Sequence, residues 1–438
     1  MAAPTLETDG TILRITSGTS GDPVTLNDVW DWDDGGGSSG GDGDIPIDGG
    51  GTEKVSAYLT EHVADGVYQV HKGIQIGNGV TSTYFQSLGE SVHFDTGYGV
   101  DVSVTATTIV LRLSRWSLAT PNGQIKYIRG TNTVIDRSII ENRGGCDDIR
   151  IYGCTVQDAI LSGPSGGRSG RFTIGNNTTL TNVIVTNSGN VNLDGSPSVL
   201  TLNSKNNTWG VYTYNFSVTV SSVSFVDIVT ADVWVNGATG HIILIDSDDP
   251  TTILHSNAAN TTIAKKTVNI HVNDKNGANL AAVTVVADSF GNIVSADAGS
   301  TFYRCIVDHT SGVFADDLAA GKWELTTAAN AALAGVAGGA GTGAWVTGIA
   351  YVKLAHEFSV ATDANGDIAE QTLTRKQWVG TSEALLSYAP YKFGFVKAGY
   401  QSLTLENIEI DAATVWTQEL QDISSGASTG PIDQQWIR

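Results

Sequence analysis

The stretch that decides the fold is a six-residue pattern that recurs between residues 135 and 225. It reads IDRSII at 135–140, IYGCTV at 151–156, LTNVIV at 180–185 and VSSVSF at 220–225, with a weaker copy, LNSKNN, at 202–207. Each copy has an apolar residue, two turn-type residues, a small or apolar residue, any residue and a second apolar residue. We interpret each copy as a strand that ends in a corner and restarts, with side chains alternating inward and outward. One turn of such a coil cannot bury its apolar row, whereas stacked turns join their rows into one core.

Short β segments separated by Gly, Asn, Asp and Ser extend over 52–263. Turns of about 20 residues with variable gaps at the corners are typical of a β-solenoid. The pattern resembles the right-handed parallel β-helix of pectate-lyase-like proteins and phage tailspikes, over roughly half of the chain. The alternative is a β-sandwich of many short strands.

The composition favours an all-β protein of two or three domains. The 438 residues include 51 Gly, 9 Pro and only 16% charged residues, and no long stretch has the helical period. The net charge of −21 makes nucleic-acid binding and attachment to an anionic membrane unfavourable. We therefore expect neither partner.

The N-terminal 51 residues are strongly acidic, with ten carboxylates and one basic residue, Arg14. We predict an anchoring arm over 1–34 and a flexible Gly/Asp-rich linker over 35–51. Trp30 and Trp32 are the predicted anchors, because exposed tryptophans in a polar arm are costly unless they insert into a partner. The alternative is a partly disordered tail. The acids of this arm could hold Ca²⁺, but their spacing departs from the EF-hand pattern, so we interpret them as solvated.

The pattern of apolar and polar residues changes near residue 264. Alternating strands at 267–272 and 281–287 flank the turn at 273–277, which predicts a hairpin. The segments 268–292, 358–373 and 391–410 resemble the two halves of a carboxypeptidase-regulatory-like, immunoglobulin-like module. This resemblance implies an Ig-like β-sandwich over 264–425, split by an Ala/Gly-rich insertion and followed by a tail at 426–438. The run 328–345 is expected to be a flexible loop.

The three cysteines, Cys146, Cys154 and Cys305, are too few for a disulfide framework. Cys146 and Cys154 could close a small loop, although buried free thiols are the preferred interpretation. The N-terminus lacks the features of a secretory signal, and no segment of about 18 apolar residues could span a bilayer. We expect synthesis in a cytoplasm, even if the protein later works outside one.

Motifs for common chemistries are missing. The glycine-rich 165–170 lacks the ending of a nucleotide-binding loop, and neither HExxH nor GxSxG occurs. His241, His255 and His271 are interpreted as strand-edge residues, since no pair has metal-ligand spacing. We expect no metal and no cofactor.

Glycan cleavage is the enzymatic alternative, because β-helices host hydrolases and lyases. Hydrolysis needs two carboxyls about 5 to 9.5 Å apart, which neighbouring turns could supply on one outer face. The candidates are Asp136, Glu141, Asp147, Asp148 and Asp158. Arg137, Arg143 and Arg150 lie nearby and could supply the base of a lyase. Nothing in the spacing marks these residues as paired across a groove, so a solvated face is preferred.

The preferred function is therefore structural. A β-solenoid followed by a split Ig-like module looks like predicted virion proteins of tailed phages. The resemblance implies a non-enzymatic capsid decoration or tail component on the virion surface, in contact with other virion proteins. A homotrimer and weak binding of host surface glycans through the loops of the Ig-like module are further expectations. The alternatives are a tailspike-like polysaccharide depolymerase and a bacterial surface adhesin or filament subunit.

Overall fold

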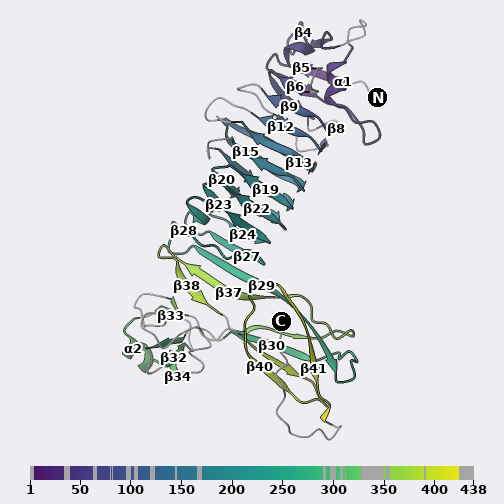
Figure 1. The fold of residues 1–438 in the computed structure, drawn as a ribbon. Helices are drawn as coiled ribbons and strands as arrows, with labels where there is room; N and C mark the ends of the chain where they lie inside the picture. The colour runs from purple at the N-terminus through teal and green to yellow at the C-terminus, as the bar shows by residue number, and fades with distance from the viewer. Residues whose placement is uncertain are drawn as a thin grey trace. The chain divides into compact units, whose positions relative to one another are not determined.

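The computed structural model of the chain divides into two compact units (Figure 1). Unit 1 comprises Met1–Ile242 and Asp248–Asn260, and unit 2 comprises Ile243–Ser247 and Thr261–Arg438, so the division falls within β27 (His241–Ile245). The structure describes residues 4–33, 40–62, 67–78, 80, 82–94, 100–102, 107–118, 124–143, 146–164, 170–289, 293–295, 302–305, 309–310, 312–326, 350–351, 356–388 and 391–423.

Unit 1 is a parallel β-solenoid in which each turn of the chain passes through three sheets and successive turns pair in parallel. Sheet I contains the first halves of β13 (Gln124–Asp136) and β15 (Cys146–Gln157), then β17 (Arg171–Ile174), β20 (Asn190–Leu193), β23 (Trp209–Tyr214), β26 (Ala231–Asn236) and β28 (Ile253–His255). Sheet II contains β8 (Thr83–Leu88), β11 (Thr107–Arg112), the second halves of β13 and β15, β18 (Thr179–Thr181), β21 (Ser198–Val199) and β24 (Ser217–Ser221). Sheet III contains β6 (Val67–Val70), β9 (Ser91–Phe94), β12 (Arg115–Leu118), β14 (Ile139–Asn142), β16 (Ile160–Ser162), β19 (Val183–Thr186), β22 (Leu202–Lys205) and β25 (Val223–Val226).

The parallel β-solenoid predicted from the six-residue pattern is thus confirmed, but two copies occupy other places in the coil. The copies at 135–140, 180–185 and 220–225 start in one row of sheet II, whereas Ile151 pairs with Ile174 in sheet I and Leu202 pairs with Val183 in sheet III. The row in sheet II, read through consecutive partners, is Ile135, Val156, Leu180, Val199 and Val220. These positions are 21, 24, 19 and 21 residues apart, so the true turns are more regular than the pattern implied.

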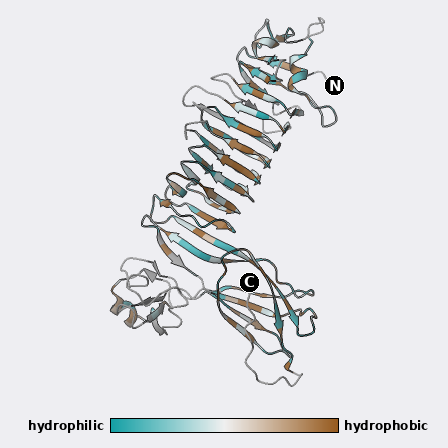
Figure 2. Cartoon of the chain, viewed as in Figure 1, coloured by the Kyte–Doolittle hydropathy of each residue, from teal (hydrophilic) through white to brown (hydrophobic). Residues whose placement is uncertain are grey.

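The core of unit 1 lies between the sheets, and apolar segments recur on strand after strand (Figure 2). Trp116 of sheet III is almost fully buried, with its ring centroid 6.2 Å from Phe85 of sheet II and 5.8 Å from Phe94. Its indole nitrogen donates to Ser87 Oγ at 3.1 Å, so the buried N–H group of Trp116 has a hydrogen-bond partner.

The corner between sheets II and III repeats one backbone feature: a residue with positive φ turns the chain from one sheet into the next. Gly and Asn adopt this conformation most readily, whereas other side chains meet a steric cost. The row consists of Gly89, Leu113, Arg137, Asp158, Asn182 and Ser222.

The N-terminal segment belongs to unit 1, which differs from the predicted arm and linker. It contains β1 (Leu6–Thr8), β2 (Ile12–Ile15), α1 (Leu26–Trp30), β3 (Asp44–Pro46), β4 (Thr52–Lys54), η1 (Val55–Ala57) and β5 (Leu59–His62). Strand β2 pairs in parallel with β7 (Gly73–Ile76), which pairs with β10 (Val100–Val102). Antiparallel β1 follows β2 in that sheet, and antiparallel β5 pairs with β6 in sheet III. The unit therefore includes the described parts of 1–51, because their backbone bonds and buried side chains join the coil.

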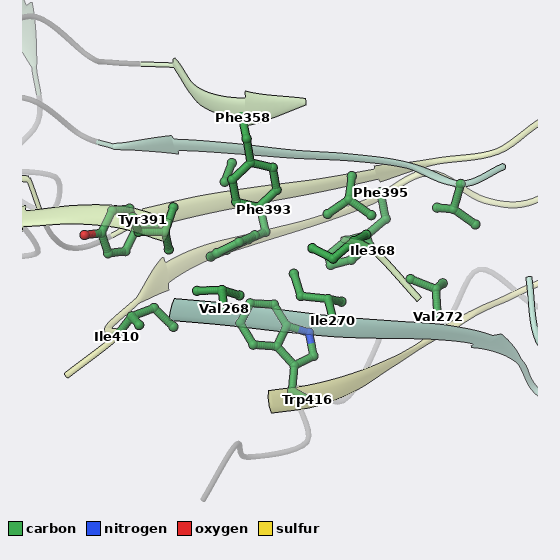
Figure 3. Packing of buried hydrophobic residues seen from close by; sticks show 14 of the residues in the cluster. Val268, Ile270, Val272, Phe358, Ile368, Tyr391, Phe393, Phe395, Ile410 and Trp416 are labelled. Carbon is green, nitrogen blue, oxygen red and sulfur yellow. The ribbon is translucent and has the colours of Figure 1, made fainter. Parts of the chain in front are cut away.

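Unit 2 contains two sheets that share one apolar core (Figure 3). One sheet contains β29 (Thr261–Asp274), β37 (Gln371–Val379), β38 (Ala384–Ser387) and β41 (Thr414–Leu420). The other has the order β36 (His356–Ala361), β30 (Thr284–Ser289), β39 (Tyr391–Val396) and β40 (Leu403–Ile408), with antiparallel neighbours. Phe393 lies between the sheets with its ring centroid 4.8 Å from that of Trp416.

The predicted turn at 273–277 is present and is closed by one antiparallel bridge between Asn273 and Asn279, but the pairing does not continue into a hairpin of β29 with β30. Asp274 Oδ1 accepts from the amides of Asn276 and Ala278, and Gly277 has φ +79°. After the turn the chain enters the other sheet, where β30 pairs with β36 and β39. The physical reason is that β29 and β30 both carry apolar rows, which face one another across the core instead of lying side by side.

The described part of the insertion has a small core of its own, in which buried Cys305 and Trp323 pack with Phe314. Its elements are β31 (Ile293–Ser295), β32 (Phe302–Cys305), β33 (His309–Thr310), α2 (Phe314–Ala319), β34 (Trp323–Thr326) and β35 (Ala350–Tyr351). The run 328–345, expected to be a loop, and the tail 426–438 lie outside the described residues.

Candidate functional site

Asp136, the first of the predicted catalytic acids, ends the sheet II half of β13 and is almost completely buried. Its carboxylate accepts from Arg112 Nε at 2.8 Å, Gln157 Nε2 at 3.0 Å and Arg137 Nη2 at 3.1 Å. The hydrogen bonds from Arg137 and Gln157 stabilise the charged form and lower the pKa of Asp136. A carboxyl with these partners is a fixed acceptor and is poorly suited to donate a proton.

Asp158 lies on the next turn at the same corner, is exposed, and accepts from Asn182 Nδ2 at 3.1 Å. Glu141 lies in β14 of sheet III, where Arg115 Nη2 donates to both carboxylate oxygens at 3.0 and 3.1 Å. Partial burial opposes its ionisation, but the hydrogen bonds from Ser117 and Arg115 outweigh this effect and lower the pKa of Glu141.

Asp148 lies in the sheet I half of β15 and is fully buried. It accepts from Thr173 Oγ1 at 2.7 Å and Arg150 Nε at 2.8 Å, and Arg171 Nε lies 3.2 Å away. The side chains of Asp147 and Cys146 lie outside the described residues, whereas Cys154 is buried with its Sγ atom 3.2 Å from the Tyr152 carbonyl. The structure thus brings Asp136 and Asp158 to one corner and places Glu141 and Asp148 on the other two sheets.

Trp30 and Trp32 are half-buried against the chain itself. A Cβ atom on Gly41 would lie 2.3 Å from the Trp30 ring, and one on Gly43 would lie 2.8 Å from the Trp32 ring. The Gly41 amide also donates to the Trp30 carbonyl at 2.8 Å. Glycine at these positions lets the backbone approach the indoles closely. Residues of the same chain therefore cover part of both indole rings. That these rings anchor the protein to a partner stays a prediction.

The outward face of sheet I carries a set of side chains that the sequence argument missed. The inward positions of its strands hold buried apolar residues such as Ile151, Phe172 and Val233. The alternate positions point away from that core and stack in register, because parallel partners on successive turns present their side chains on the same face. One outward row reads Tyr127, Arg150, Thr173, Asn192, Tyr212 and Trp234.

One end of this face is cationic. The guanidinium carbon of Arg129 lies 5.2 Å and that of Arg150 lies 5.6 Å from the ring centroid of Tyr127. Arg150 and Arg171 share the single carboxylate of Asp148. Two arginines thus meet at one acid and a third, Arg129, lies over the neighbouring Tyr127 ring, although the chain as a whole carries a net charge of −21.

The middle of the face is polar and hydrogen-bonded across turns. Asn192 Nδ2 donates to Thr173 Oγ1 at 3.1 Å, and the Tyr152 hydroxyl donates to Asp194 Oδ2 at 2.6 Å. Burial, with the hydrogen bond to Asp194, raises the pKa of Tyr152, so this hydroxyl keeps its proton at neutral pH. These bonds fix the side chains between the two ends.

The other end is aromatic. Trp234 lies with its ring centroid 4.8 Å from Trp209 and 4.9 Å from Tyr212, and all three side chains are half-buried. Asn236 Nδ2 donates to the Tyr212 hydroxyl at 3.3 Å, and Tyr214 beside them is 52% exposed. Such rings bind flat apolar surfaces, and the adjacent amide and hydroxyl groups can form hydrogen bonds.

We name the face, from Tyr127 to Trp234 along sheet I, the aromatic–arginine face. It can hold an extended ligand that combines apolar ring faces with many hydroxyl groups. A signal for it exists in WGVYTY at 209–214, which holds three aromatic residues within one short strand. The sequence alone does not show that this strand belongs to a binding face, because the six residues of the row come from six different turns and are aligned only by the pairing of those turns.

Within the described parts of the chain, no three His, Cys, Asp or Glu side chains gather closely enough to hold a metal ion. Neither α1 nor α2, the α-helices among the described residues, is long enough to cross a membrane. No family model, curated protein or solved structure matches the chain, so its interpretation rests on the geometry of its own residues.

Proposed function

We propose that the protein is a non-enzymatic structural subunit on the surface of a tailed-phage particle and contacts host surface glycans through the aromatic–arginine face. The observation that carries the glycan part is the Trp209–Trp234–Tyr212 cluster, which lies on the same face of sheet I as the aligned polar and guanidinium groups. Sugar rings have apolar faces that stack on aromatic rings and hydroxyl groups that such polar groups bind.

The rigid support of this face favours binding of a chain rather than of one sugar. Its side chains project from strands whose backbone bonds join successive turns, so little order has to be gained on binding. The repeat from turn to turn offers similar contacts at regular intervals. Because two arginines, Arg150 and Arg171, meet at the one carboxylate of Asp148, the ligand we propose is a polysaccharide that carries acidic groups.

A role without turnover is supported by the state of the candidate acids. Hydrolysis requires one carboxyl that stays protonated and a second that is ionised across the scissile bond. Asp136 has a lowered pKa, and Asp148 lies among two arginines and a threonine. A glycan depolymerase remains the second candidate, because Asp136 and Asp158 lie at one corner on either side of Arg137.

The proposal includes two features of the whole assembly. Unit 2 is proposed to be an immunoglobulin-like module of the carboxypeptidase-regulatory type, supported by its two facing sheets and by the turns at Asp274 and Asp363. The solenoid is proposed to be right-handed and the subunit a homotrimer, which would cover exposed apolar side chains such as Ile184 on sheet III.

The proposal is tested by two experiments. Mass spectrometry of phage particles purified from a culture whose phage genome encodes this chain should find it in many copies; absence from those particles would refute the virion part. The full chain should bind acidic capsular polysaccharide in a titration without releasing reducing ends. Steady release of reducing ends would establish the depolymerase instead, and the absence of binding to neutral and acidic glycans would refute the glycan part.

A further inference from the structure

Two polar atoms on neighbouring turns of sheet I are shielded from solvent and have no hydrogen-bond partner within the described part of the chain. They are the side-chain oxygen of Asn190, Oδ1, and the indole nitrogen of Trp209, Nε1. Asn190 is only 7% exposed, and Trp209 is half-buried. A buried donor or acceptor that lacks a partner costs free energy, so such atoms are uncommon in folded proteins. Two of them on paired residues point to a ligand.

These two residues are direct partners in the parallel ladder of sheet I. Asn190 of β20 pairs with Trp209 of β23, so their backbones lie about 4.8 Å apart. On the preceding turn, Asn190 pairs with Arg171. Asn190 faces outward, because the next residue, Val191, is fully buried in the core, and the Trp209 ring lies 4.8 Å from that of outward-facing Trp234. The acceptor and the donor thus belong to the aromatic–arginine face, between its cationic and its aromatic end.

The chemistry of the two atoms decides which group can bind them together. An indole N–H only donates, and an amide oxygen only accepts. A hydroxyl group satisfies both, because its oxygen accepts from Trp209 while its hydrogen is donated to Asn190. A carboxylate or sulfate could accept from Trp209, but it has no hydrogen for the Asn190 oxygen, and its charge would be repelled by that oxygen. The acidic group of a sugar instead suits Arg171, whose side chain is 43% exposed.

We propose that Asn190 and Trp209 form a hydroxyl-binding subsite, which holds one sugar hydroxyl group next to an acidic group at Arg171. The inference rests on the proposed glycan binding and adds which chemical group is recognised at this point of the face. Because both atoms are shielded in the free chain, surface side chains turn aside as the sugar enters. The two hydrogen bonds that are gained offset this movement, since they also remove the cost of two unpaired atoms. A sugar whose hydroxyl group is substituted at this position binds less well.

Trp209→Phe in the full chain tests the subsite, because it keeps an aromatic ring beside Trp234 and removes the N–H donor. Calorimetric titration with the sodium salts of alginate, polygalacturonate and hyaluronate measures binding. Trp234→Phe, the same substitution in the neighbouring ring, is the reference for lost ring area. Trp209→Phe should bind roughly fivefold more weakly than Trp234→Phe, the effect of one neutral hydrogen bond. In urea unfolding it should be no less stable than Trp234→Phe, because it removes an unpaired N–H group.

Asn190→Ala and its combination with Trp209→Phe complete the test. Their losses of affinity should not add, because both variants lose the same hydroxyl group. Additive losses, or equal binding by Trp209→Phe and Trp234→Phe, would overturn the subsite and leave glycan binding intact. A much larger loss of stability in Trp209→Phe than in Trp234→Phe would show that the N–H group is paired within the chain, which also overturns it. If the unmodified chain binds none of the three polysaccharides, the proposed binding of acidic glycans fails and the subsite with it.

Discussion

Trp209 and Trp234 lie on neighbouring turns of the solenoid with ring centroids 4.8 Å apart and ring planes inclined by 39°. Neither ring points into the core, which these two strands fill with Val211, Val233 and Val235. The binding that we propose for this pair can therefore be separated from its contribution to stability by substitution.

Trp234→Ala should weaken polysaccharide binding at least about tenfold, or ~1.4 kcal/mol, because it removes the ring that contacts both Trp209 and Tyr212. Stability should fall by only about 1 kcal/mol, the usual contribution of an aromatic pair. Calorimetric titration and thermal unfolding measure the two effects. Tyr84→Ala, which removes a half-buried aromatic side chain from sheet II, is the control and should bind normally. Equal losses in both variants would count against the aromatic–arginine face.

Leu113→Asn should stabilise unit 1 by about 1 kcal/mol. Leu113 has φ +53° and is 60% exposed, so it bears the steric cost of the left-handed region with little burial in return. Asn182 occupies the equivalent corner three turns later with the same φ. Urea unfolding would measure the gain. Leu88→Asn, in the extended strand β8, should bring none, and a gain there would show that polarity rather than φ is responsible.

Asp136→Asn should destabilise the fold by about 1–3 kcal/mol at pH 7, because Arg112, Arg137 and Gln157 lose a charged acceptor. The folded pKa of Asp136 lies below its ordinary value of 3.8, so its stabilisation is fully present above that value. It is lost as the pH falls through the lowered folded pKa. Urea titrations from pH 6 to pH 2 should therefore show the variant and the unmodified chain converging. Asp158→Asn, at an exposed position, should change little throughout.

Gly366→Ala should destabilise unit 2 by roughly 2–4 kcal/mol, and Gly277→Ala by about 1 kcal/mol. Both glycines have positive φ, +83° and +79°, in turns of the form Asp-x-Asn-Gly. A Cβ on Gly366 would lie 2.5 Å from the Val272 carbonyl oxygen, whereas one on Gly277 would meet nothing within 4 Å. The difference between the two unfolding free energies isolates the clash from the shared backbone cost. Equal losses would mean that the Gly366 turn can shift away from β29.

Much of the candidate site could not be read from the sequence. The acids Asp136 and Asp148 were selected because they are close in sequence, yet they lie on different sheets and each forms an ion pair with arginine. The aromatic–arginine face was missed for the opposite reason, since Tyr127 and Trp234 are more than a hundred positions apart and share a row only through the coil. Trp30 and Trp32 seemed exposed because nothing in the sequence indicates that Gly41 and Gly43 accept their rings.

What the sequence alone determined is the local alternation: which side chains turn inward, where the corners lie, and that single turns must stack to bury their apolar rows. The turns at Asp274 and Asp363 are equally local, because each is closed by its own Asp side chain and glycine. Only the tertiary structure decided that Val156, and not Ile151, lies beside Ile135, and that β29 and β30 face one another across a core. The reason is that register and sheet membership are set by pairing between distant residues, and a pattern of period two carries no information about which distant strand becomes its neighbour.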